Sequence, residues 1–336
     1  MTEMSKQKIV ELPLLEPIYS TYHNGIFSAA LYSNPSHRNW YLNESAVLVC
    51  SRDFLSGYTS PKLDVKGVGL YENPNLIREW HSMRYMGGYI NPFIRNLIDN
   101  GFYIYFIGID DYYMEGKSWY KEKHFFHDGA ICGYDQKNKT YCIYAYDKNW
   151  IYRKFWTPQK AFNDGHKSVL RAEGQYGNIC AVKPKPDIIK LSPETVYQKI
   201  TEHLDSSMEK YPKEEKGNVF GVVVHEYIID YLGRLFDGTI PYERMDRRIF
   251  RLMWEHKKNM HERLSVTEDA VGMEKKYSSL YQPLVKEADS IRMLYASHHM
   301  KRRDSVLPII QKKLLNIMED EKRILTEFTD ALAKEI

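Results

Sequence analysis

Apolar and polar positions follow two different periods along this chain, and the period changes near the middle. In the first half, apolar residues form short runs between turns. The clearest run, 102–109, begins after Gly101 and is followed by Asp110 and Asp111. Such runs predict β-strands, whereas the second half repeats its apolar residues every three or four positions, which predicts amphipathic helices. We therefore expect an α+β first half and a helical second half.

A β-hairpin is predicted within residues 124–147. Two apolar runs, 129–132 and 140–146, flank the polar turn residues 136–139. His127 lies at the start of the first strand and Asp147 directly follows the second, so antiparallel pairing would bring them side by side. We predict His127 as a general base and Asp147 as its orienting carboxylate. The alternative is that both are polar residues at strand ends that reach solvent.

Other segments are assigned by the same patterns. A connector is predicted at 182–187, where two prolines and two lysines occur in six residues. Ser192 followed by Pro193 predicts the start of a helix. The boundary gives an α+β domain over 1–181 and a helical domain over 188–336. Within the first domain we expect helices at 25–31, 76–85 and 92–99, a strand at 151–156, and short strands or buried turns at 46–50 and 66–70.

The last predicted helix, 307–331, carries an apolar stripe that is interrupted by Glu321. We expect the stripe to pack against the helices near 250–264 and 284–295. Glu321 should lie at the edge of the bundle or meet a Lys or Arg, because an unpaired buried carboxylate is costly. A dimer seam is the alternative, and the sequence leaves the oligomeric state open.

Composition narrows the class of protein. The chain has 336 residues, of which 43% are hydrophobic and 27% charged, with a net charge of +3. These values are typical of a folded globular protein and do not favour a nucleic acid as partner. We find no signal peptide and no membrane-spanning stretch, and so expect a cytoplasmic protein. The four cysteines show no metal-ligand or disulfide spacing, Cys132 and Cys142 are expected to face each other in reduced form, and no motif predicts a cofactor or metal.

Several motifs together resemble the butirosin biosynthesis protein H family, which is related to papain-like enzymes of the bacteriocin-processing peptidase type. The resemblance covers nearly the whole chain, and its parts are the stretch 17–23, His127-Asp128-Gly129, Gly133-Tyr134-Asp135, the stretch 246–250, Glu255-His256-Lys257 and Met260. It implies a papain-like α+β domain followed by a helical domain. It also implies an acyltransferase that moves an aminoacyl group from a carrier-protein thioester to an amine, with a Cys, a His and an Asp as site residues.

The chain departs from this family where the nucleophile is expected. Asn24 stands in the place of the Cys, and an amide has no nucleophile comparable to a thiolate. Ser28, one helical turn further, and the distant Cys50 are alternative nucleophiles that the motif does not place. Asn24 at a helix start would cradle an oxyanion or serve as an N-cap, with His23 and Ser28 beside the substrate.

Two further segments are candidates for binding. The segment Asp110-Asp111-Tyr112-Tyr113 is comparable to an Asp-x-Tyr segment of the family, which implies that Asp111 and Tyr112 contact substrate, although a turn at a strand end explains them as well. The basic stretch 246–260 would dock an acyl or peptidyl carrier protein, or it is a solvated helix face with Phe250 and Met253 in the core.

The resemblance implies an acyltransferase-like protein of nonribosomal-peptide or aminoglycoside-type antibiotic biosynthesis. His127 would activate an acceptor amine that attacks the thioester directly. The alternative is a catalytically inactive relative, a pseudoenzyme, that binds a peptide, a pantetheine arm or an antibiotic in the papain-like cleft.

Overall fold

A computed structural model describes residues 9–14, 36–56, 60–67, 73–172, 177–207, 217–246 and 248–336. The chain forms two compact units, each built from two separate stretches. Unit 1 comprises Met1–Pro35 and Pro74–Asp187, and unit 2 comprises Ser36–Asn73 and Ile188–Ile336. The predicted connector at 182–187 ends at a unit border, but its first three residues belong to a strand, β9 (Asn178–Pro184). The segment 36–73, which the sequence places in the first domain, packs with the helical unit instead.

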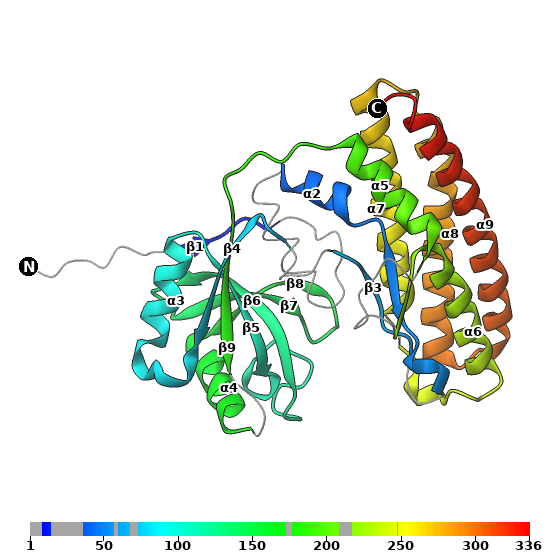
Figure 1. Ribbon diagram of the computed structural model, residues 1–336. Helices are drawn as coiled ribbons and strands as arrows, with labels where there is room; N and C mark the ends of the chain where they lie inside the picture. The colour runs from blue at the N-terminus through cyan, green and yellow to red at the C-terminus, as the bar shows by residue number, and fades with distance from the viewer. Residues whose placement is uncertain are drawn as a thin grey trace, which may run out of the picture. The chain divides into compact units, whose positions relative to one another are not determined.

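Unit 1 is built on an antiparallel seven-stranded sheet (Figure 1). The strand order is β4 (Leu76–Ser82), β9 (Asn178–Pro184), β5 (Tyr103–Asp110), β6 (Phe126–Asp135), β7 (Thr140–Tyr146) and β8 (Tyr152–Pro158), and β1 (Ile9–Glu11) also pairs with β6. Three of these strands were not predicted as strands. Residues 76–85, expected as a helix, form β4 and a short 3-10 turn, and neither β1 nor β9 was expected. Because β9 lies between β4 and β5, its pairing explains why the segment 76–82 is extended.

Two helices, α3 (Ile90–Asp99) and α4 (Gln159–Arg171), contribute side chains to the main core of unit 1. Phe162 of α4 packs edge-on against Phe106 of β5, with ring centroids 5.4 Å apart. Gly165 lets α4 approach closely, since a Cβ atom at this position would lie 3.0 Å from the Asp110 carbonyl oxygen. This close approach brings α4 against the end of β5.

The predicted hairpin is confirmed, with β6 and β7 paired antiparallel. The register shifts between Ile131 and Gly133, which marks a bulge beside Cys132. The thiols of Cys132 and Cys142 lie 3.5 Å apart, both are buried and neither forms a disulfide, as predicted.

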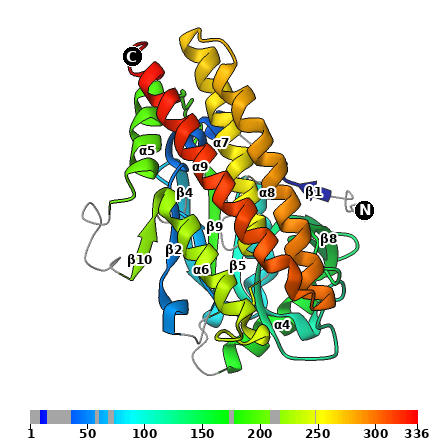
Figure 2. The same cartoon turned by 90° about the vertical axis from the view of Figure 1, so that its right-hand side faces the viewer.

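Unit 2 combines a small sheet with long helices (Figure 2). The sheet order is β10 (Asn218–Phe220), β2 (Leu48–Ser51) and β3 (Leu63–Val65). The helices are α2 (His37–Glu44), α5 (Pro193–Asp205), α6 (Val224–Phe236), α7 (Ile249–Val271), α8 (Lys276–Lys301) and α9 (Leu307–Leu332). The described chain is therefore mixed α and β, with a helical C-terminal part.

A local sequence signal explains where helix α5 of unit 2 begins. The Ser192 hydroxyl accepts a hydrogen bond from the Thr195 amide at 3.1 Å, which confirms the predicted N-cap of α5.

The last helix of the chain, α9, packs with α5, α6 and α8. The C-terminal part of the α9 stripe shares a core with Met260 of α7 and Leu284 of α8, as expected, but α6 and α5, which were not expected as partners, also pack against α9.

Segment 36–73 is anchored to unit 2 by a buried arginine. Arg263 of α7 donates hydrogen bonds to the carbonyl oxygens of Tyr41 and Leu42, at 3.2 and 2.6 Å, and so satisfies carbonyls at the C-terminal end of α2. Asn259 donates to the Ser45 hydroxyl at 2.6 Å. These contacts explain why the segment belongs to the helical unit.

Candidate functional site

The candidate site lies at the edge of the unit 1 sheet where β5 ends and β6 begins. The adjacent acids Asp110 and Asp111 stand at this end, and each carboxylate is buried. A bulge precedes them, because the pairing shifts between Phe106 and Ile109 and Gly108 has a positive φ of 74°. Bulges often redirect side chains near functional sites.

His127 lies in a polar cluster with two layers. Its Nδ1 atom is 3.1 Å from the Lys117 Nζ atom, which is also 3.4 Å from an oxygen of Asp111. The Lys117 and Asp111 side chains are only 1% and 4% exposed. The His127 and Asp128 side chains are 22% and 26% exposed. A bound molecule would thus meet His127 and Asp128, with Lys117 and Asp111 beneath them.

The buried pair has shifted proton affinities. Burial raises the pKa of Asp111 to about 6, against the lowering effect of Lys117. Burial also lowers the pKa of Lys117, against the raising effect of Asp111. Both shifts reduce the cost of a neutral pair relative to an ion pair. The proton on Lys117 is therefore less tightly held than on an exposed lysine.

Asp128 approaches His127 more closely than strand geometry predicts. Adjacent side chains on a strand normally point to opposite faces, but an Asp128 oxygen lies 3.7 Å from the His127 Nε2 atom. The β5 bulge lies opposite this pair, and bulges increase local twist and change side-chain direction. The other Asp128 oxygen accepts a hydrogen bond from the Tyr105 hydroxyl at 3.2 Å.

Asp147 is engaged elsewhere. Its carboxylate accepts hydrogen bonds from the Asn149 and Ile151 amides, at 2.8 and 2.9 Å, and from Arg153 Nε at 2.6 Å. Burial tends to raise its pKa, but these hydrogen bonds and the Arg153 charge outweigh burial and lower it. Within the described part of the chain, Asp147 makes no hydrogen bond or ion pair with His127.

Asp147 instead shapes the aromatic surroundings of His127. The turn that it stabilises contains Trp150, whose φ is +59° and whose ring lies 6.4 Å from the His127 ring. Tyr146, directly before Asp147, lies 6.1 Å from His127, and Phe125 lies 5.6 Å away. Three aromatic rings thus surround the imidazole.

Tyr112, predicted to contact substrate, stacks on His124 with ring centroids 4.5 Å apart. The His124 Nδ1 atom lies 2.7 Å from an oxygen of Asp110. That oxygen also accepts a hydrogen bond from Ser168 of α4 at 2.6 Å. The tandem acids therefore serve two histidines: Asp110 holds His124 directly, and Asp111 reaches His127 through Lys117.

The sequence pattern did not identify the residues that hold His127 and His124 in place. Lys117 is one of three lysines within 117–123, and nothing in their spacing marks it as the buried one. The available signal was the repeated pairing of an acid at the end of β5 with a histidine at the start of β6.

The other predicted site residues do not join this cluster in the described structure. His23, Asn24 and Ser28 lie outside the described residues. Cys50 lies on β2 in unit 2, fully buried, and burial raises the pKa of its thiol to about 12. A thiol in this state is a poor nucleophile.

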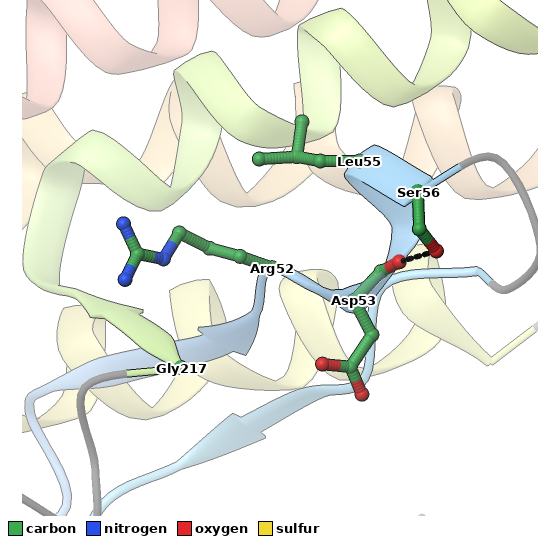
Figure 3. Close-up of a pocket in the computed structure, with 5 residues that line it drawn as sticks. All are labelled: Arg52, Asp53, Leu55, Ser56 and Gly217. Atoms are coloured by element: carbon green, nitrogen blue, oxygen red, sulfur yellow. Dashed lines mark hydrogen bonds between the residues drawn. The ribbon is translucent and has the colours of Figure 1, made fainter.

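Unit 2 contains a cavity of about 550 Å³, which is lined by Arg52, Asp53, Leu55, Ser56 and Gly217 (Figure 3). The Ser56 hydroxyl donates a hydrogen bond to the Asp53 carbonyl oxygen at 2.6 Å. The Arg52 guanidinium and the Asp53 carboxylate extend in different directions. The lining includes no histidine or cysteine, so the cavity is a weaker candidate for chemistry than the His127 cluster.

A second titratable cluster is fully buried among the helices of unit 2. Lys257 Nζ lies 2.6 Å from a Glu321 oxygen, so Glu321 meets a lysine, one of the two outcomes expected. Tyr281 donates a hydrogen bond to the same carboxylate, and His225 and His203 approach it at 3.4 and 3.8 Å. Lys257 belongs to the stretch that was interpreted as a solvated face. Phe250 and Met253 of that stretch are buried, as this interpretation expected.

Comparison with known proteins gives no family for this chain. No protein-family model matches it, and a search of curated proteins finds no match. Among the described residues, no group of His, Cys, Asp and Glu side chains is arranged to hold a metal ion. No described helix is long and apolar enough to cross a membrane.

Proposed function

We propose that this chain is an acyltransferase-like protein whose first part is papain-like and whose proton-transfer residue is His127. It would move an acyl or aminoacyl group from a carrier-protein thioester to an amine in cytoplasmic antibiotic biosynthesis. The observation that carries the proposal is the arrangement of His127, a partly exposed imidazole held from beneath by the buried Lys117–Asp111 pair.

The protonation state of Lys117 decides what His127 does. A protonated Lys117 donates to Nδ1, which leaves the ring proton on Nε2. A neutral Lys117 accepts from Nδ1–H, which leaves the Nε2 lone pair free to take a proton from an acceptor amine. Because burial lowers the pKa of Lys117, the basic form of His127 is easier to reach.

The proposed transfer does not need a thiolate. The amine attacks the thioester carbonyl, the carbon–sulfur bond breaks, and His127 removes the proton that the amine loses. Proximity and proton removal together account for large rate effects in such reactions. All four cysteines are buried, which is consistent with a reaction that uses none of them.

A pseudoenzyme that binds its ligand without chemistry is the second candidate. The engagement of Asp147 by Arg153 and two amides favours this alternative, because the expected His–Asp pair is not formed. The rings of Phe125, Tyr146 and Trp150 would then form a binding surface for a pantetheine arm or a peptide.

The test combines loaded carrier proteins with amine acceptors. The full chain is incubated with aminoacyl carrier proteins and amines, and thiol release and amide mass are followed. His127→Gln should lower turnover by about 100-fold or more. Lys117→Met should remove the rise of activity with pH that deprotonation of Lys117 causes. Lys123→Met is the matched control, since Lys123 is an exposed lysine of the same loop, packed over Trp119.

The outcomes separate the two candidates. Turnover that depends on His127 and Lys117 but not on Lys123 supports the transferase. Absence of turnover with every loaded carrier, together with saturable binding of a pantetheine thioester that His127→Gln weakens, would instead favour the pseudoenzyme. Turnover unchanged in His127→Gln would refute the proposed role of His127.

A further inference from the structure

His124 is the second histidine at this sheet edge, and its contacts differ from those of His127. The Asp110 side chain is fully buried, and its carboxylate accepts hydrogen bonds from three donors of the described chain. One oxygen takes the Tyr112 amide at 3.1 Å and the Phe125 amide at 3.3 Å. The other takes Ser168 Oγ at 2.6 Å and faces His124 Nδ1 at 2.7 Å. Because three other donors fix the Asp110 carboxylate, the oxygen that faces His124 is held in one position.

This contact sets the tautomer of His124. A carboxylate accepts hydrogen bonds, so the Nδ1 atom facing it carries the ring proton. In the neutral ring, the lone pair then lies on Nε2. At His127 the tautomer depends on Lys117 instead, because a protonated Lys117 donates to Nδ1 and leaves the ring proton on Nε2. While Lys117 is protonated, the two histidines therefore present different Nε2 atoms, His124 with a lone pair and His127 with a proton.

The His124 ring is also open to other molecules. Its side chain is 60% exposed, although Asp110 beneath it is buried. Tyr112 stacks against the ring at 4.5 Å and fixes its plane. Among the described residues, the Nε2 atom has no hydrogen-bond partner. Unit 1 therefore holds a largely exposed imidazole in a fixed orientation.

We propose that His124, positioned by Asp110, is a nucleophilic site that accepts acyl groups from small activated esters and thioesters. Histidine is among the side chains that form covalent intermediates. The Nε2 lone pair attacks the carbonyl carbon, the Nε2–carbon bond forms and the bond to the alkoxide or thiolate breaks. The leaving group takes the electron pair, and Asp110 takes the Nδ1 proton. Water or an amine then attacks the acyl-imidazole and breaks the Nε2–carbon bond, Asp110 returns its proton to Nδ1, and the leaving group takes up the proton that the attacking molecule loses.

This activity is independent of the function proposed for His127, because it needs neither a carrier protein nor Lys117. The probe is p-nitrophenyl acetate, whose cleavage releases a coloured phenolate. The full chain should cleave it in a reaction that His124→Gln removes. Asp110→Asn should slow that component at least about ten-fold, because an amide can donate to Nδ1 and so favour the wrong tautomer.

A control variant isolates the role of the dyad. His81→Gln removes a partly exposed histidine of β4 whose Nε2 atom faces Glu79 at 3.4 Å, and should change nothing. A rate lost equally in His81→Gln, or kept in His124→Gln, would overturn the proposal.

A spectroscopic measurement distinguishes positioning from a general loss of structure. Long-range proton–nitrogen correlation of the labelled chain reports which ring nitrogen carries the proton. His124 should give the Nδ1–H form in the native chain and lose this preference in Asp110→Asn. A native His124 with its proton on Nε2 would refute the inference, whatever the esterase rate.

Discussion

The buried Lys257–Glu321 pair permits a quantitative test of how unit 2 is stabilised. Both side chains are fully buried, and the Nζ–Oε2 distance is 2.6 Å. Replacing Lys257 by Met keeps the volume of the stem but leaves the Glu321 carboxylate without its cation. Removing one partner of a buried pair costs about 3–5 kcal/mol. We expect about 3 kcal/mol, since Tyr281 still donates to the carboxylate and His203 and His225 lie close enough to share a proton with it.

The assay is urea unfolding of the full chain, followed by circular dichroism at the helix band and analysed as a double-mutant cycle. Lys257→Met and Glu321→Gln should each destabilise unit 2, and the double variant should cost much less than their sum. The coupling free energy should reach about 2–3 kcal/mol, the upper range for residues in direct contact.

A surface pair supplies the matched control. Lys313 Nζ lies 2.6 Å from a Glu287 oxygen, the same distance as in the buried pair, but these side chains are 30% and 35% exposed. Lys313→Met should therefore cost less than about 1 kcal/mol. If Lys257→Met costs no more than Lys313→Met and shows no coupling to Glu321, burial is not what makes the Lys257–Glu321 pair important.

Three further outcomes follow from buried groups. Burial lowers the pKa of His225 from 6.5 to about 3. Between these pH values the unfolded chain therefore binds a proton at this position that the folded chain does not bind. In urea unfolding, the free energy of unfolding should fall by about 1.4 kcal/mol for each pH unit below 6.5 for such a histidine. His225→Gln should reduce this slope. Iodoacetamide at neutral pH should leave Cys50 unmodified until denaturant is added, and rapid labelling of native Cys50 would contradict its burial and its raised pKa. Leu314→Ala should destabilise unit 2 by about 2–5 kcal/mol in the same unfolding assay, because Leu314 is fully buried in α9.

The features that the sequence predicted well depend on local signals. The β6–β7 hairpin follows from two apolar runs and one polar turn, and the α5 start follows from Ser192 and Pro193. The segment 76–82 was wrongly predicted as a helix. Its extended form depends on pairing with β9, about a hundred residues later, which a local window does not contain.

As with the fold, only the part of the candidate site that has a local sequence signal was predicted. His127 was found because it opens a strand, but its partners depend on side-chain packing. Lys117 comes from a loop, and Asp128 turns toward His127 beside a bulge in another strand. The partner of Asp147 is Arg153, six positions away, and this local ion pair competes with the distant one that strand order suggested. One interpretation of the stretch 246–260 placed Lys257 on a solvated face, because no local signal indicates its partner Glu321, which is 64 positions away.

The interleaved division of the chain has a consequence during synthesis. When residue 187 leaves the ribosome, every described strand of unit 1 has been made. Segment 36–73 must still wait for β10, which pairs with β2, and for Arg263, which binds the end of α2. At a translation rate of roughly 5–20 residues per second, this delay is on the order of ten seconds. For that interval the apolar residues of β2 and β3 have no partner from α7 or β10, and a chaperone that recognises short apolar strands would find its target there.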